Sequence, residues 1–471
     1  MDSRITARAL AVALGGWRTR EPAYEALADG IRVLCLDNRL AARTLLPAER
    51  ELAHALHLSR TTVAGAYRSL RDSGHIESLR GSGSVTLPRP HREPARAAVG
   101  DDEVDLQRAS LAAWPGLAGV MTDVALDASA IVARAGYDVR GSLALRSAIA
   151  ERYTRLGVPT HPEEILVTTG AQAAISLLAH TLLRRGDRAA IETPTYPNAA
   201  DALRAAGARL VGVPVTTTDG WDVDRAQQAF ARTSPTLAYL MPRYQNPTGR
   251  CMSWDEEHAF AAAAAGVGTT LVIDETTGEL TIDGLPQAPA FLGADVVRIG
   301  SLAKTVWGGL RIGWVRADRD LVQRLVAARP PHDLGTPEFE QAVGTRLVER
   351  LDEILPQRSA LLREGRDVLR EELARLLPQW RVPDVAGGVA MWIQLDAPLS
   401  TAIVLAARAH GIHLSSGSRF GVDAVHDRHL RLPFTATTDE LRRSVAVLAR
   451  LWPTVQGVAP ASHADLLDAV V

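Results

Sequence analysis

The stretch Ser301–Val315, SLAKTVWGGLRIGWV, holds the only lysine of the 471-residue chain. The sequence contains 52 lysine and arginine residues, so the other 51 are arginines. An arginine can replace a lysine in most ion pairs, but its guanidinium stays protonated and cannot condense with an aldehyde, whereas a lysine amine can. A GC-rich codon bias explains the arginines without explaining where the single lysine lies. The role of Lys304 therefore has to be judged from the motifs around it.

The composition is that of a globular protein with more than one domain. A chain of 471 residues with 46% hydrophobic and 23% charged residues predicts about two or three domains. No stretch offers the roughly 18 to 20 uninterrupted apolar residues of a membrane span, and the N-terminal segment lacks a convincing signal-cleavage site. Cys35 and Cys251 are the two cysteines, which gives no disulfide framework and no metal-ligand cluster. We therefore expect a cytoplasmic protein without a metal site.

The net charge of −2 conceals an asymmetry along the chain. Residues 1–100 contain 15 arginines against 10 acidic residues, a net charge of +5, so the remainder carries −7. A basic N-terminal segment joined to an acidic remainder favours an anionic partner for the N-terminal segment alone. We call residues 1–100 the basic front and the remainder the body. An arginine-rich face that merely contacts water is the alternative, so the local pattern has to decide.

The basic front has the pattern of three helices followed by a hairpin. Apolar spacing and turn residues predict helices over 21–34, 47–56 and 60–73 and a hairpin over 75–87. Pro47 suits the start of the second helix, and Ser59 is a natural N-cap for the third, which Gly74 ends. This order is typical of a winged helix-turn-helix, which we assign to residues 18–87.

The start of the third helix is the candidate DNA-reading element. In a winged helix-turn-helix the second helix of the motif enters the major groove, while its surroundings grip phosphate. A capped helix start has free N–H groups that suit a phosphate, and short hydroxyl side chains can approach base edges. The candidate DNA contacts are Arg50, Ser59, Arg60, Thr61, Thr62, Arg80 and Gly81.

This region also carries a family resemblance. The stretch over 45–86, LLPAERELAHALHLSRTTVAGAYRSLRDSGHIESLRGSGSVT, resembles the DNA-binding domain of GntR-type bacterial regulators almost residue for residue. The likeness covers about 65 residues. It implies a double-stranded DNA operator as a partner.

The rest of the chain alternates strand-like and helical segments. Residues 88–104, rich in proline and charge, predict a linker, and residues 105–455 predict a mostly parallel sheet covered by helices on both faces. The strand-like runs are EILVTTG, AAIET, RLVGVPV, LAYLMP, TLVIDE, VVRIGS and RIGWV. Long helices over 336–377 and a smaller α+β segment follow, and residues 456–471 have the composition of a loose tail. We expect a multidomain protein with an α+β head, an α/β body and a small α+β C-terminal subdomain.

Lys304 lies among motifs that suit a cofactor with an aldehyde and a phosphate. It follows the run VVRIGS and lies seven residues before Arg311, so this pair could hold the aldehyde carbon and, through a bidentate clamp, the phosphate. Asp274 ends the run TLVIDE, where a carboxylate could pair with a pyridinium nitrogen and make the ring an electron sink.

Three motifs further upstream fit the same cofactor. Asn246 in YQNPTG lies in a turn and could hydrogen-bond a phenolic oxygen, and Tyr196 in TPTYPN could stack on a pyridine ring. The motif TTGAQAA ends a strand and opens a helix, so its residues Gly170, Ala171 and Gln172 could cradle phosphate. Each motif has a plain alternative, namely a helix-capping aspartate, an ordinary turn or a core tyrosine.

Together and in this order, the motifs resemble the fold type I aminotransferase family, whose NPTG motif, strand-end aspartate and Schiff-base lysine followed by arginine occur in this succession. The resemblance spans roughly residues 105–455 and implies pyridoxal phosphate as the cofactor. It implies that Lys304 forms the internal aldimine and that Asp274 meets the ring nitrogen, which makes these two the catalytic candidates.

The same resemblance assigns the remaining site residues. Asn246 would contact the ring hydroxyl and Tyr196 the ring face, and the phosphate would be held by Gly170, Ala171, Gln172, Ser301 and Arg311. Arg431, in HLRLPF, matches the arginine that grips the α-carboxylate of an amino acid. Because the family builds its site at a dimer interface, the resemblance also implies a homodimer.

The sequence departs from the family pattern at three places. The tyrosine usually found shortly after the aspartate is replaced by Thr276 or Thr277, and the serine often found just before the lysine is Ala303. Asn198 lies where a second arginine would clamp a distal carboxylate. The first two changes could weaken binding of the cofactor. The third argues against a ligand that needs a clamp for a second carboxylate.

The two halves joined in one chain resemble the MocR subfamily of transcriptional regulators. The resemblance implies a body that binds pyridoxal phosphate through Lys304 and senses a small amine, an amino acid or the cofactor itself, with DNA binding as the output. Such a switch requires a ligand that binds one arrangement of the protein better than the other. The alternative is an active aminotransferase with an accessory DNA-binding domain.

Overall fold

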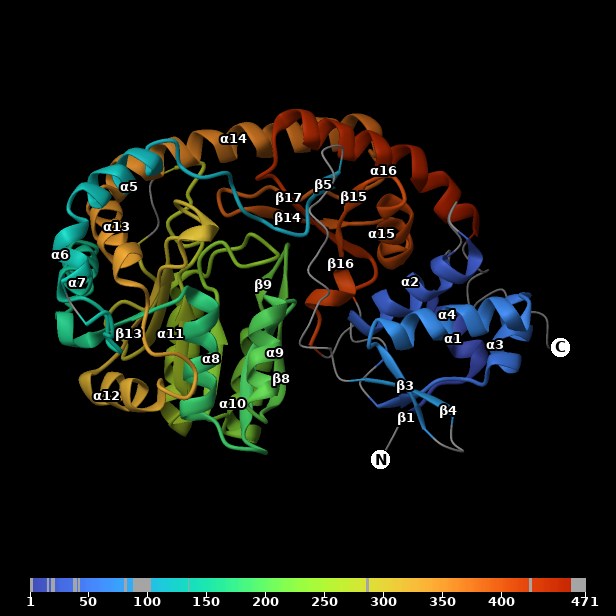
Figure 1. Cartoon of the computed structure of the whole chain (residues 1–471), viewed down its shortest axis with the longest axis horizontal. Coiled ribbons are helices and arrows are strands. Elements are labelled where there is room, and N and C mark those ends of the chain that lie inside the picture. Colours follow the sequence, from blue (N-terminus) through green and yellow to red (C-terminus); the bar gives the residue numbers. More distant parts are fainter. Residues whose placement is uncertain are drawn as a thin grey trace.

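Two sheets of different size belong to the two main parts of the molecule, the N-terminal domain and the body (Figure 1). The computed structural model describes residues 3–14, 17, 22–36, 40, 43–79, 83–87, 103–133, 135–284, 288–422 and 426–458. A four-stranded sheet belongs to the first domain, and an eight-stranded sheet forms the centre of the body. The multidomain fold expected from the sequence, an α+β head and an α/β body with a small α+β subdomain, is confirmed.

The first domain is a winged helix-turn-helix. Its helices are α1 (Ala7–Leu14), α2 (Ala23–Leu36), α3 (Glu49–Leu56) and α4 (Arg60–Asp72). Its strands are β1 (Ser3–Arg4), β2 (Thr44–Leu45), β3 (Ile76–Leu79) and β4 (Gly83–Thr86), in the order β1-β2-β4-β3. The strands β3 and β4 pair antiparallel and form the expected hairpin.

The boundaries of α4 follow from its capping residues. The Oγ of Ser59 accepts a hydrogen bond from the N–H of Thr62 at 3.0 Å, and Gly74, with a φ of 69°, follows the helix. The core of this domain also contains Leu10 and Leu14 of α1, which lie upstream of residue 18. The packed head therefore includes α1.

The body is built on a sheet with strand order β6-β13-β12-β11-β10-β7-β8-β9. These strands are β6 (Ile165–Thr168), β7 (Arg188–Thr193), β8 (Arg209–Thr216), β9 (Gly220–Trp221), β10 (Leu237–Leu240), β11 (Thr270–Asp274), β12 (Val297–Ser301) and β13 (Gly313–Arg316). The pairs from β12 through β11, β10 and β7 to β8 are parallel, whereas β13 is antiparallel to both neighbours. The mostly parallel sheet expected from the sequence is confirmed.

The helices around this sheet and the C-terminal elements complete the body. The helices are α5 (Leu117–Leu126), α6 (Ala128–Val132), α7 (Leu143–Arg155), α8 (Ala171–Leu182), α9 (Pro197–Ala205), α10 (Val223–Thr233), α11 (Trp254–Val267), α12 (Arg319–Ala328), α13 (Glu338–Glu349), α14 (Leu351–Leu376), α15 (Ser400–Arg408) and α16 (Thr438–Val458). The other strands are β5 (Val104–Asp105), β14 (Ala390–Gln394), β15 (Ile412–His413), β16 (Ser415–Ser416) and β17 (His429–Pro433). No helix within the described ranges is long and apolar enough to cross a membrane.

Helices cover both faces of the large sheet because successive residues of a strand point to opposite sides. In β10, Leu237 and Tyr239 pack in the core shared with α8 and α9, while Ala238 and Leu240 pack in the core shared with α10 and α11. A strand buried on both faces is continuously apolar, as the run LAYLMP is. The ends of such strands are therefore the places where polar side chains can gather.

The helix α14 connects the large sheet to the C-terminal part of the body (Figure 1). Its first turns place Leu351 and Ile354 in a core beside β6 and β13, and its later turns place Leu362 and Leu369 in the core of β14 and β17. The two parts of the body thus share one continuous helix.

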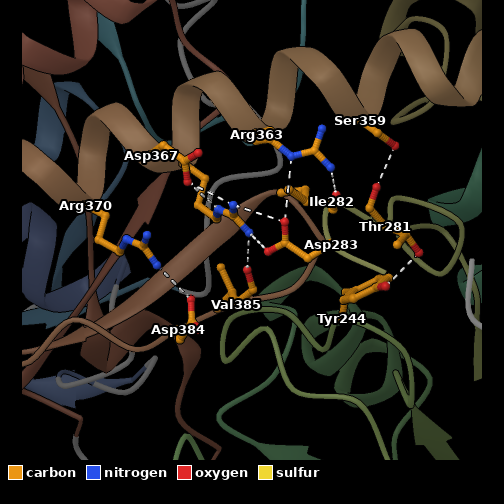
Figure 2. Close-up of polar contacts among 11 residues, drawn as sticks. Tyr244, Thr281, Ile282, Asp283, Ser359, Arg363, Asp367, Arg370, Asp384 and Val385 are labelled. Carbon is orange, nitrogen blue, oxygen red and sulfur yellow. Dashed lines mark hydrogen bonds and ion pairs between the residues drawn. The ribbon is translucent and has the colours of Figure 1, made fainter. Parts of the chain in front are cut away.

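Arginine side chains fasten α14 to the loop that follows β11 (Figure 2). Arg366 forms an ion pair with Asp283, and Arg363 donates a hydrogen bond to the carbonyl of Ile282. In the same region, Ser359 Oγ donates to the carbonyl of Thr281 at 2.5 Å, and Thr281 Oγ1 is hydrogen-bonded to the Tyr244 hydroxyl at 2.7 Å. These contacts connect α14 to the turn that begins at Tyr244.

The space around two glycines predicts opposite effects of alanine substitution on the stability of the protein. A Cβ on Gly365, in α14, would lie 2.1 Å from the carbonyl oxygen of Phe434, so Gly365→Ala should lower the free energy of unfolding by roughly 1–3 kcal/mol. Gly266 in α11 has no described atom within 4 Å of such a Cβ, and Gly266→Ala should be stabilising by about 0.5–1 kcal/mol. Chemical denaturation of both variants checks this, and equal effects would contradict the close packing of α14.

Candidate functional site

The candidate site lies at the edge of the large sheet where its parallel strands end. The predicted residues that follow or end β6, β7, β10, β11 and β12 at this edge are Gly170, Tyr196, Asn246, Asp274 and Lys304. Because β13 is antiparallel, it begins at the same edge, directly after Arg311 and Ile312. Ligands of open α/β sheets bind outside the carboxyl ends of the strands, which is the place where these residues meet.

The side chain of Lys304 is half-buried at this edge of the sheet. Its Nζ donates a hydrogen bond to the carbonyl of Ala109 at 2.5 Å. Burial, with a smaller contribution from Arg431, lowers the pKa of Lys304 to about 8, while Asp274 opposes this shift. The neutral amine is the nucleophilic form, so Lys304 is better prepared to attack an aldehyde at neutral pH than an ordinary lysine is.

Asp274 is buried and held by two hydrogen bonds. Its carboxylate accepts from the Tyr239 hydroxyl at 2.5 Å and from the N–H of Thr276 at 2.8 Å, while burial raises the pKa of the carboxyl. Tyr239 was not predicted as a site residue, although a tyrosine in a buried strand usually needs a partner for its hydroxyl. The hydroxyl of Thr277, one of the two threonines that replace the missing tyrosine, donates to the carbonyl of Tyr244 at 3.2 Å and holds that turn.

Arg431 reaches the same place from the C-terminal part of the body. It lies in β17, donates a hydrogen bond to the carbonyl of Gln107, and stacks over the ring of Phe420 at 5.0 Å. Burial lowers the pKa of Arg431 to about 10. Burial also raises the pKa of Tyr196, whose hydroxyl feels the charges of both Asp274 and Arg431. The predicted lysine, aspartate, tyrosine and carboxylate-binding arginine are therefore close enough to interact electrostatically.

Gly170 and Arg311 form a compact cradle next to these residues. Gly170 has a φ of 90°, and a Cβ there would lie 2.7 Å from Nη2 of Arg311, so a side chain at this position would displace the guanidinium. Arg311 donates to the carbonyl of Thr169 at 2.7 Å. The N–H groups of Ala171 and Gln172, in the first turn of α8, have no acceptor within the helix. Together with the guanidinium they form a donor set that suits a phosphate.

Two residues assigned to the phosphate have other partners in this structure. The Ser301 hydroxyl donates to the carbonyl of Ile312 at 2.9 Å and accepts from the N–H of Ala303 at 3.1 Å, which closes the turn before Lys304. The Gln172 side chain donates to the carbonyl of Asn198 at 3.2 Å. Their contacts to phosphate stay a prediction.

A buried carboxyl that motif reasoning missed supports the turn of Asn246. Glu192, near the end of β7, accepts hydrogen bonds from Gln245 Nε2 at 3.2 Å and from the N–H of Met241 at 3.1 Å, and Gln245 accepts in turn from the N–H of Thr248 at 3.0 Å. Burial raises the pKa of Glu192 to about 7. The amide oxygen of Asn246 is itself buried, and no hydrogen-bond partner for it lies among the described residues. The sequence feature that could have indicated this buried carboxyl is the single glutamate, Glu192, within the apolar run AAIET.

The described candidate DNA contacts gather at α3 and the start of α4. Arg50, Ser59, Arg60 and Thr61 are exposed. The side chain of Arg60 is 75% exposed, with its Nε 3.7 Å from a Glu49 carboxylate oxygen. The Ser59 hydroxyl is 2.7 Å from the hydroxyls of both Thr61 and Thr62, so these three residues form one polar cluster. Arg80 and Gly81 lie outside the described residues.

The fold and the site together define a class of protein. A winged helix-turn-helix is joined to an α/β body whose sheet edge holds a half-buried lysine near a buried carboxylate and a buried arginine. The model for aminotransferase class I and II matches residues 121–448, and the model for bacterial regulatory proteins of the gntR family matches residues 23–85. The chain belongs to the class I and II aminotransferase family and carries an N-terminal GntR helix-turn-helix domain.

Relatives of the chain include regulators with this architecture. It is 25% identical over 442 residues to the uncharacterized HTH-type transcriptional regulator YdfD of Bacillus subtilis, covering 85% of this chain and 90% of YdfD. It is 32% identical over 328 residues to the probable rhizopine catabolism regulatory protein MocR of Rhizobium meliloti, covering 62% and 65% of the two chains. The predicted combination of a GntR head with an aminotransferase body is therefore confirmed.

Solved aminotransferases share the fold of the body. The structure of LysN, the α-aminoadipate aminotransferase of Thermus thermophilus complexed with N-(5'-phosphopyridoxyl)-L-leucine, has a TM-score of 0.70 and 24% identity, covering 77% of this chain and 95% of LysN. The aminotransferase class I and II fold supports pyridoxal phosphate as the cofactor. The residues present fit it, because the Gly170–Arg311 cradle suits a phosphate, the unpartnered amide of Asn246 suits a ring hydroxyl, and Lys304 offers the amine.

The charges around Lys304 predict how its reaction with an aldehyde depends on pH. The rate at which pyridoxal phosphate reacts with the cofactor-free protein should rise with pH with a midpoint near 8, since burial lowers the pKa of the amine to about 8. Asp274→Asn should shift the midpoint down, because that carboxylate favours the protonated amine, and Arg431→Met should shift it up. Stopped-flow absorbance checks these signs, and a wild-type midpoint near the ordinary lysine value of roughly 10.4 would show that Lys304 is fully hydrated.

Proposed function

We propose that this protein is a transcriptional regulator that binds pyridoxal phosphate through Lys304 and uses the loaded body to sense a small amine, an amino acid or the cofactor itself. The observation that carries the proposal is that the Lys304 amine is near enough to Asp274 and Arg431 for both charges to act on it, in a chain whose N-terminal domain is a helix-turn-helix. Pyridoxal phosphate, when bound, supplies an aldehyde that reacts reversibly with amines. Arg431 is suited to hold the carboxylate of an amino acid, and Asp274 is suited to hold a proton on a ring nitrogen.

A second candidate function is transamination. The same side chains that would hold a cofactor and an amino acid are those with which transamination begins, and relatives include enzymes such as the arginine–pyruvate transaminase AruH of Pseudomonas aeruginosa, 32% identical over 321 residues. Incubation of the purified protein with amino acids and a keto acid separates the two functions. Sustained multiple turnover would support the enzyme, whereas at most a single turnover would support the regulator.

Two further properties belong to this proposal. We propose a homodimer, because large apolar side chains are exposed in and around α5, α6 and the start of α7, namely Leu126, Val132, Tyr137 and Leu143. Sedimentation of the purified protein tests this state. A regulator has to reach the chromosome, so we also propose a cytoplasmic location.

Substitution of the lysine tests the cofactor site. Lys304→Ala should abolish the visible absorbance that appears when pyridoxal phosphate is added, without loss of the fold measured by circular dichroism. Lys304→Arg keeps the positive charge but cannot condense with an aldehyde, so it should abolish the absorbance equally. Absorbance that survives in either variant would show that another group binds the aldehyde.

Substitution of Arg60 tests the DNA site. Arg60→Ala should weaken binding to DNA from the regions flanking the gene by roughly tenfold and leave the visible absorbance unchanged. Arg225→Ala removes another exposed arginine, on α10 of the body, and should leave DNA affinity unchanged. Fluorescence anisotropy at moderate salt measures both, and equal affinities for the wild type and Arg60→Ala would show that α4 is not the reading helix.

A further inference from the structure

One segment of the body lies directly on the two cations of the site. We call residues 103–112, which follow the predicted linker, the strap. The carbonyl of Ala109 accepts a hydrogen bond from Lys304 Nζ at 2.5 Å, and the carbonyl of Gln107 accepts one from Arg431 Nη2. The strap thus contacts both nitrogen groups that the proposed function assigns to ligands.

The beginning of the strap is attached to the C-terminal part of the body. Its strand β5 pairs in parallel with β15, through hydrogen bonds from the N–H of Val104 to the carbonyl of Gly411 at 2.8 Å and from the N–H of Leu106 to the carbonyl of His413 at 2.9 Å. Both Val104 and Leu106 are buried in the hydrophobic core of that part, and Gln107 Nε2 donates to the carbonyl of Leu414 at 2.8 Å.

The end of the strap is attached to α14. Arg358 of that helix donates a hydrogen bond to the carbonyl of Ala112 at 2.5 Å, and the N–H of Trp114, two residues later, donates to the carbonyl of Val306 at 3.0 Å. The two carbonyls that contact Lys304 and Arg431 therefore lie between two attachments, and residue 103 is joined through the linker to the DNA-binding head.

The strap carbonyls accept hydrogen bonds from two cations that a ligand would bind more strongly. A buried cation without an acceptor is costly, so these carbonyl contacts stabilise Lys304 and Arg431. A carboxylate forms stronger, charge-assisted hydrogen bonds to a guanidinium than a neutral carbonyl does, and it can bind two nitrogens at once. The Nε of Arg431 is buried and has no partner among the described residues, whereas the neighbouring Nη2 on the same edge is held by Gln107.

We propose that the strap is a built-in competitor for the ligand site: the cofactor on Lys304 displaces the carbonyl of Ala109, a carboxylate on Arg431 displaces the carbonyl of Gln107, and each displacement loosens residues 103–110. This inference rests on the proposed function, since it requires that Lys304 and Arg431 bind these groups. Because the strap continues into the linker, its release alters how the head is held to the body.

Hydrogen–deuterium exchange of the full chain tests the release. Exchange at the N–H groups of Val104 and Leu106 is measured in the free protein, with pyridoxal phosphate alone, and with pyridoxal phosphate plus propionate, a carboxylate without an amine that leaves the cofactor on Lys304, while visible absorbance reports occupancy of Lys304. Exchange at these two positions should increase by about tenfold or more with both compounds, since opening of β5 governs it. Propionamide in place of propionate is the matched control, because it has no carboxylate for Arg431, and it should give a smaller increase.

The outcomes of this experiment separate the two proposals. If no visible absorbance develops, the proposed cofactor function fails and the strap proposal fails with it. If absorbance develops while exchange at Val104 and Leu106 stays unchanged or slows, the cofactor function stands and the strap proposal is wrong. Equal increases with propionate and propionamide would contradict the part of the proposal that involves Arg431.

Weakening the strap gives a second test. Leu106→Ala removes an apolar anchor and should increase the affinity for pyridoxal phosphate about tenfold, because the competitor then binds less well. Leu373→Ala, in α14, removes the same side chain from the same core outside the strap and should leave the affinity unchanged. Gln107→Ala, which removes the hydrogen bond to Leu414 and leaves the core intact, should act in the same direction by about threefold.

These variants also distinguish competition from support. If Leu106→Ala and Gln107→Ala both bind pyridoxal phosphate more weakly than Leu373→Ala, the strap helps to form the site instead of competing with the ligand. If the three variants bind alike, the carbonyl contacts have no energetic consequence. Either result overturns the proposal. Gln107→Ala keeps the test decisive if Leu106→Ala fails to fold.

Discussion

The hydrogen-bonded ladder of the large sheet is the constraint on which the rest of the body depends. Its parallel strands run their carboxyl ends to one edge, and the antiparallel strand β13 begins at that same edge. Residues as far apart in the chain as Gly170 and Arg311 are thereby held in contact. A shift of one residue in this register would exchange the two faces of a strand, so the apolar cores on both sides of the sheet also fix the position of Asp274 and Lys304.

The site brings opposite charges together at one edge of the large sheet. Asp274 raises the pKa of Lys304 and Arg431 lowers it, so the state of the amine depends on both neighbours as well as on burial. The strap carbonyls accept hydrogen bonds from the two cations, and the Tyr239 hydroxyl donates one to the carboxylate. The amide oxygen of Asn246 and the Nε of Arg431 are buried and have no partner among the described residues, so these two groups are left for a ligand to satisfy.

Local patterns predicted much of this structure. The cap at Ser59, the hairpin after α4 and the mostly parallel sheet follow from short-range rules. Lys304 and Asp274 were singled out because their motifs suit a specific chemistry, and Arg431 was assigned through the family resemblance. Contacts between distant segments could not be predicted in this way. The hydrogen bond from Tyr239 to Asp274 joins two strands, Glu192 looked like one more residue of a buried strand, and the strap carbonyls belong to backbone groups that every residue has. Motif patterns likewise gave no sign that the Ser301 hydroxyl would close its own turn.

The use of arginine at every other cationic position has a practical consequence. Lys304 is the only ε-amino group of the chain, so a protease specific for lysine cleaves the unfolded polypeptide once, between residues 304 and 305. The same singularity means that a label placed on a lysine side chain can occupy one position only. Since the amine of this lysine is hydrogen-bonded to the Ala109 carbonyl, the extent of labelling at Lys304 reports how accessible the site is, once the label on the N-terminal α-amino group has been counted separately.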